Sequence, residues 1–95
     1  MFNKLKQFKD IRDKAKNIQS KLADESSTSE SNGVSLTMDG NLKLTKVNVN
    51  ADLLNADKKD RLEKAFISAH DDVSKKIQKI MATKMREMGG IPGLS

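Results

Sequence analysis

The chain has 95 residues, of which 36% are hydrophobic and 33% are charged, and its formal net charge is +5. This length and composition allow one small domain with a thin core, and small chains of this kind often gain stability by associating with further copies. The absence of cysteine excludes disulfide frameworks and thiolate metal sites, and the lack of any apolar run of about 18 residues excludes a membrane-spanning helix.

The first segment, residues 1–23, is predicted to form a basic amphipathic helix. Its apolar side chains recur every three or four residues and form one narrow stripe, as in a helix with a single packed face. Because so narrow a stripe packs against only a small surface, we expect much of this helix to project from the domain. The stripe consists of Phe2, Leu5, Phe8, Ile11, Ala15, Ile18 and Leu22.

The middle of the chain is predicted to be a loop followed by a hairpin. Residues 24–32 are polar and rich in serine, which indicates a flexible loop. Residues 33–50 alternate apolar and polar side chains around an Asp-Gly pair, which tolerates the positive φ of a tight β-hairpin turn. The alternation changes parity in the second strand and predicts a β-bulge near Thr45 and Lys46. Two strands alone are marginal in water, so this hairpin needs a partner.

The rest of the chain is predicted to be mainly helical. Residues 51–55 form a short helix capped by Asn50, and a long helix over residues 57–88 begins with Asp57 as its N-cap. Glycines and a proline end this helix, and residues 89–95 form a flexible tail. The apolar stripe of the long helix consists of Leu62, Phe66, Ala69, Val73, Ile77 and Ile80.

Positive charge belongs to the two helical segments and not to the hairpin. Residues 1–22 hold seven basic and two acidic side chains, residues 58–95 hold nine and five, and residues 23–57 hold two and six. This distribution fits a polyanionic partner, although an ordinary solvated, lysine-rich surface is the alternative. Lysine far outnumbers arginine, so binding to DNA would rest on phosphates and depend on salt, because bidentate reading of guanine favours arginine.

Catalytic groups are scarce in this sequence. The single histidine, His70, lies in the long helix, and one imidazole without a second cannot form a zinc site of the usual kind. No glycine-rich phosphate-binding loop occurs. We therefore expect neither an enzyme nor a cofactor, metal or small-molecule substrate. The closely spaced charges of the first 22 residues exclude a signal peptide, so a cytoplasmic location is expected.

The order of these segments resembles the YbaB/EbfC family of small bacterial nucleoid-associated proteins. After the basic first helix and polar loop, the resemblance is carried by Gly33–Gly40 (GVSLTMDG), Val47–Leu54 (VNVNADLL) and the start of the long helix. It covers nearly the whole chain. Asn50-Ala51 stand where the family usually has Asp-Pro.

The resemblance implies an α+β fold with a long N-terminal helix, a small antiparallel sheet, a short helix and a long C-terminal helix. It also implies a tweezer-like homodimer that binds double-stranded DNA in the nucleoid, with the sheets joining the subunits. The implied dimer interface consists of Val34, Leu36, Met38, Leu42, Leu44 and Val47. The implied DNA contacts come from the basic faces of the two helices, at Lys6, Lys9, Arg12, Lys16, Lys75, Lys76, Lys79 and Lys84.

Two other functions remain open from the residues. A dimeric protein-interaction adaptor or chaperone would use the helix stripes together with Met81, Met85 and Met88, which form a flexible apolar strip. The basic first helix could instead lie on an anionic membrane, but its apolar stripe is too narrow for strong insertion. A membrane is therefore the least favoured partner.

Overall fold

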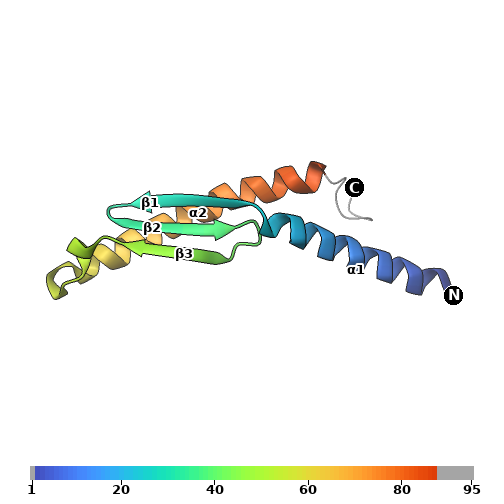
Figure 1. The fold of residues 1–95 in the computed structure, drawn as a ribbon, viewed down its shortest axis with the longest axis horizontal. Helices are drawn as coiled ribbons and strands as arrows, with labels where there is room; N and C mark the ends of the chain where they lie inside the picture. The colour runs from blue at the N-terminus through green and yellow to red at the C-terminus, as the bar shows by residue number, and fades with distance from the viewer. Residues whose placement is uncertain (1, 88–95) are drawn as a thin grey trace.

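The computed structural model describes residues 2–87, which form two helices and a three-stranded antiparallel sheet (Figure 1). The α+β fold expected from the sequence is confirmed. The strands follow the chain in the order β1-β2-β3. The elements are α1 (Phe2–Ala23), β1 (Ser26–Ser31), β2 (Val34–Asp39), β3 (Leu44–Val49), the 3-10 turns η1 (Ala51–Leu53) and η2 (Ala56–Lys58), and α2 (Lys59–Glu87).

The core lies between α2 and one face of the sheet. Every fourth residue of α2 from Ala65 to Ile77 is buried, because this spacing keeps the side chains on nearly one side of a helix. These side chains pack on alternate residues of β2, which point to the same face of the sheet. The fully covered members of this core are Val34, Leu36, Met38, Ala65, Ala69, Val73 and Ile77.

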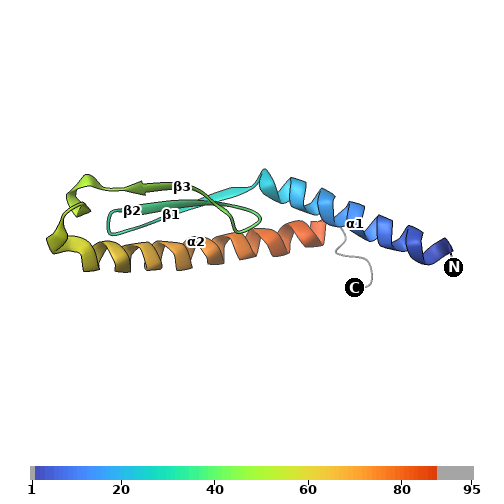
Figure 2. The ribbon, with the colours of Figure 1, turned by 90° about the horizontal axis from the view of Figure 1, so that it is seen from below.

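Helix α2 covers the sheet unevenly. It packs against β1 and β2 and crosses the sheet diagonally, and Figure 2 shows β3 farther from it than the other two strands. Residues paired directly across antiparallel strands share a face. Val47, which pairs with Leu36, therefore points to the helix side of the sheet, yet half of its surface is exposed (50%).

The predicted loop over residues 24–32 is wrong, because Ser26–Ser31 forms β1 and pairs with the whole of β2. The sequence of β1 shows no alternation of apolar and polar residues, because the residue that it buries against α2 is the polar Ser29. The turn to β2 is made by Asn32 and Gly33, with φ of 46° and 99°. Asn-Gly is the preferred sequence for a two-residue hairpin turn with positive φ at both positions.

The turn between β2 and β3 also differs from the prediction. Leu42, and not the Asp-Gly pair, adopts the left-handed conformation, with φ of 65°. The Asp39 carboxylate holds this turn by accepting hydrogen bonds from the backbone N–H groups of Asn41 and Lys43, at 2.8 and 3.2 Å. The predicted bulge is confirmed, because Thr45 is the extra residue on β3 at the break in register with β2.

The caps before α2 are provided by asparagines. Asn50 Oδ1 accepts from Asp52 N at 3.0 Å, as predicted. The predicted N-cap at Asp57 is wrong: Asn55 Oδ1 accepts from Lys58 N at 3.1 Å and caps η2, which leads directly into α2. The predicted tail, residues 89–95, lies outside the described residues.

Helix α1 projects from the end of the sheet, as the narrow stripe predicted (Figures 1 and 2). Of the side chains that the structure describes on it, only Ile18 and Leu22 are buried. Phe8, nearer the projecting end, is 78% exposed. The described chain is accordingly elongated, with principal extents of 65 × 20 × 18 Å.

Candidate nucleic-acid interface

The first basic surface lies on the projecting part of α1. Lys9, Arg12 and Lys16 are exposed, and their spacing of three and four residues places them on one face of the helix. None of the three forms an ion pair with another residue of the described chain. Lys6 lies in the same helix, but its side chain is outside the described residues. We call Lys9, Arg12 and Lys16 the α1 basic stripe.

The predicted cations of α2 divide into two pairs. Lys75 and Lys79 are exposed and form no ion pair within residues 2–87. Lys76 Nζ lies 3.4 Å from Asp72 Oδ2 and donates a hydrogen bond to the backbone carbonyl of Thr28 at 3.1 Å. Lys75 and Lys79 are thus the open pair, whereas Lys76 ties α2 to β1.

Lys84, predicted as a DNA contact, also has partners within the chain. Its Nζ lies 3.1 Å from Glu25 Oε1 and 3.5 Å from Glu87 Oε2. The hydrogen bond to the Glu25 carboxylate is the main cause that raises the pKa of Lys84. This pair joins the last turns of α2 to the short connection between α1 and β1.

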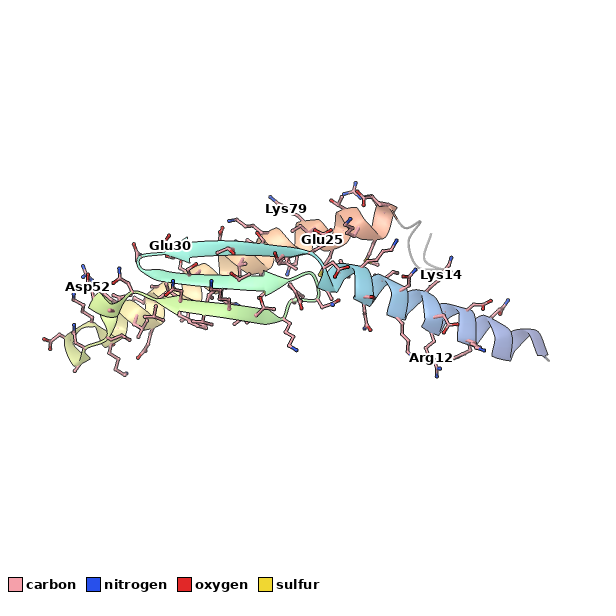
Figure 3. The ribbon with its side chains drawn as sticks, in the orientation of Figure 1. Arg12, Lys14, Glu25, Glu30, Asp52 and Lys79 are labelled. Atoms are coloured by element: carbon pink, nitrogen blue, oxygen red, sulfur yellow. The ribbon has the colours of Figure 1, made fainter. Side chains whose placement is uncertain are left out.

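A single chain does not bring the two predicted basic sets onto one surface. Figure 3 shows Arg12 on α1 and Lys79 on α2 pointing toward opposite edges of the molecule. Lys14, which was not among the predicted contacts, is exposed and points away from Arg12 (Figure 3). The sequence already indicates that Lys14 and Arg12 point in different directions, because residues two apart lie on different sides of a helix.

A polar cluster between β1 and α2 consists of Ser29, Asp72 and Lys76. The buried Ser29 hydroxyl donates to Asp72 Oδ2 at 2.6 Å, and Lys76 bonds to the same oxygen. The Ser29 hydrogen bond is the main cause that lowers the pKa of the Asp72 carboxyl, and Lys76 lowers it further. A lowered pKa means that the ionised carboxylate favours the folded state.

We therefore expect Asp72→Asn to change how stability depends on pH. The contribution of the ionised carboxylate is complete above the unfolded-state pKa of about 4 and is lost as the pH falls through the lower, folded-state value. Thermal unfolding of the wild type and Asp72→Asn between about pH 7 and pH 3 measures this. The difference in stability between the wild type and Asp72→Asn should shrink on acidification. A constant difference would show that the Asp72 carboxylate does not stabilise the fold through this polar cluster.

The part of the chain that the structure describes contains neither a group of metal ligands nor a membrane-spanning helix. No three histidine, aspartate or glutamate side chains of residues 2–87 come together as metal ligands. His70, the only histidine of the sequence, is exposed on α2. Neither described helix has the length and apolar character needed to cross a membrane.

The predicted dimer interface divides between the core and the surface. Val34, Leu36 and Met38 are at most 1% exposed in a single chain because α2 covers them. They are core residues, which corrects their assignment to an interface. Leu42 and Val47 are exposed, and Leu44 is half-buried beside the core. These three residues lie on or next to β3, the strand that α2 leaves open.

The chain is similar over nearly its whole length to proteins of known family. The model of the YbaB/EbfC DNA-binding family matches residues 1–91. Nucleoid-associated proteins of Brucella ovis and Brucella abortus are each 30% identical to it, in an alignment that covers 97% of this chain and 89% of each relative. A nucleoid-associated protein of Brucella anthropi is 28% identical with the same coverage.

A solved structure supports the fold. The crystal structure of an uncharacterized protein from Helicobacter pylori matches with a TM-score of 0.73 and 22% identity, covering 95% of this chain and 98% of that one. At this level of identity the match shows that the two proteins share a fold, and it says nothing about what either protein binds.

Proposed function

The chain belongs to the YbaB/EbfC DNA-binding family, and we propose that it binds double-stranded DNA as a homodimer in the nucleoid, mainly through phosphate contacts. The observation that carries this proposal is the α1 basic stripe. Three exposed cations, which have no ion-pair partner among residues 2–87, lie on one face of a helix that projects from the domain. Lys75 and Lys79 on α2 supply a second set, and Lys6 is proposed to extend the first.

Recognition by phosphate fits the side chains that are present. The chain has no tyrosine or tryptophan, which are the stronger stacking platforms for unpaired bases. Among the proposed contacts Lys9, Arg12, Lys16, Lys75 and Lys79, only Arg12 is an arginine. Lysine acts as a point charge that positions a duplex without reading its sequence. We expect binding that is tolerant of sequence, and a protein bound at many sites would influence nucleoid organisation and gene expression.

The proposed dimer joins two chains along β3. The two edge strands of the sheet differ, because Lys76 occupies the outward carbonyl of Thr28 on β1. The Lys76 ammonium, held at this edge by the Thr28 carbonyl, discourages pairing of β1 with another chain. Beside β3, in contrast, Leu42, Leu44 and Val47 offer apolar surface that α2 does not cover. A second copy packed there would enlarge the thin core and present two α1 helices to one duplex.

Val47→Glu is expected to convert the dimer into folded monomers, because it would bury an unpaired charge at the proposed interface. Gln78→Glu is the matched control, since it adds the same charge to the exposed side of α2. Sedimentation gives the mass of each variant, and circular dichroism shows whether it is folded. A Val47→Glu variant that keeps the wild-type mass would exclude this interface.

The function itself is tested by titrating a labelled random-sequence duplex and competing it with unlabelled duplexes of other sequences. Competitors of equal length should displace the label at concentrations within a few-fold of one another. Absence of binding in low salt would exclude the proposal. A stable complex with another protein at high salt, without DNA binding, would instead favour an interaction adaptor.

A further inference from the structure

The C-terminal end of α1 is held by the turn between β2 and β3. The Gly40 N–H donates to the carbonyls of Leu22 and Glu25, at 2.9 and 3.1 Å. The Asn41 side-chain amide donates to the carbonyl of Gln19 at 3.0 Å. The last four carbonyls of a helix lack partners within the helix. The Leu22 carbonyl is one of them, so the Gly40 N–H helps to cap α1 from a distant part of the chain.

Glycine at position 40 is required by close approach and not by backbone conformation. Gly40 is buried, and its φ is outside the left-handed region. A Cβ at this position would lie 2.3 Å from the Leu22 carbonyl oxygen and 2.9 Å from its carbon. These are backbone atoms that cannot rotate away, so any side chain at position 40 must displace the C-terminal end of α1 from its contact with the β2–β3 turn.

Few side chains fix the direction of α1. Among its described side chains only Ile18 and Leu22 are buried, and the connection that follows the helix is held on its other side by the Glu25–Lys84 ion pair. That pair is about one-third exposed at each side chain, and an exposed ion pair constrains geometry only weakly. The Gly40–Asn41 contacts therefore act together with the packing of Ile18 and Leu22 to restrain the base of the projecting helix.

We propose that Gly40 and Asn41 are positioning residues for DNA binding, which set the direction in which α1 presents its basic stripe. This inference rests on the proposed function. A helix that is already oriented pays no ordering cost when it meets the duplex, whereas a freed helix must be fixed at the moment of binding. Loss of these contacts should weaken DNA binding although neither residue belongs to the α1 basic stripe.

The position of α1 can be measured without DNA. Because the chain has no cysteine, Asp13→Cys and Gln78→Cys place one spin label on α1 and one on α2, both at exposed positions. Labelled chains are diluted with unlabelled chains so that each assembly carries one pair. Gly40→Ala should broaden the distance distribution, and Asn41→Ala, which removes one exposed hydrogen bond and leaves the fold intact, should broaden it less. Wild-type distributions in both variants would overturn the proposal.

Affinity is compared with a matched glycine at the far end of the sheet. Gly33→Ala strains the turn between β1 and β2, where φ is +99° and a Cβ would meet Leu53 Cδ1 at 2.9 Å, but it does not touch α1. Gly40→Ala, without labels, should weaken duplex binding about tenfold, and Gly33→Ala should leave it near wild type. Equal losses would assign Gly40 a structural role only. A wild type that binds no DNA would refute the proposed function, while the distances between the labels would still test whether Gly40 and Asn41 fix the direction of α1.

Discussion

Replacing Lys9, Arg12 and Lys16 with glutamine is expected to weaken binding to a random-sequence duplex roughly a hundredfold at moderate salt. Each phosphate contact releases condensed counterions, so the loss of three contacts from each chain removes much of the sequence-independent affinity. The three side chains are exposed and have no ion-pair partners within residues 2–87, so the variant should stay folded. Fluorescence anisotropy with a labelled duplex measures the loss.

The control variant removes the same charge from elsewhere. Lys43, Lys46 and Lys58 lie on the β2–β3 turn, on β3 and at the end of η2, outside the α1 basic stripe. Their replacement with glutamine lowers the net charge by the same amount and should reduce affinity only a few-fold. If both triple variants lost affinity equally, net charge and not the α1 basic stripe would govern binding.

The second large effect is expected from Leu36→Ala in the centre of β2. Leu36 is fully buried under α2, and truncation of such a side chain costs the transfer free energy and leaves a cavity. The expected loss is about 3 kcal/mol, which is a large part of the stability of about 5–10 kcal/mol that a small domain has. Thermal unfolding should show a midpoint more than about 10 °C lower.

Leu54→Ala is the matched control for this loss, because Leu54 is 65% exposed. It should shift the unfolding midpoint by only a few degrees. Comparable losses in the two variants would mean that Leu54 is covered in the assembled protein, and a small effect of Leu36→Ala would contradict the core described above.

The sequence reveals those elements whose side chains carry a periodic apolar pattern. α2 and the β2–β3 pair were predicted because apolar residues repeat at the periods of a helix and a strand. Strand β1 was missed because its buried position is Ser29, which pairs with Asp72 on α2. The Asn32-Gly33 pair was the available signal, since Asn-Gly is the preferred hairpin turn.

The candidate site was only partly predictable for a similar reason. A census of charge finds the basic faces of α1 and α2, but it cannot distinguish free lysines from those with partners. Lys76 and Lys84 bond to Thr28 and Glu25, which are distant in sequence and come near only in the fold. Likewise, the alternation in β2 indicates a buried face, but not that α2 covers it in the same chain.

The most direct test of the proposed function is the dependence of duplex affinity on salt. Phosphate contacts from the α1 basic stripe and from Lys75 and Lys79 predict that the wild-type affinity falls steeply between about 50 and 200 mM salt. The slope of log affinity against log salt should become shallower by about 0.9 for each phosphate contact removed with the stripe. An affinity that stays flat across this range would contradict binding through phosphates.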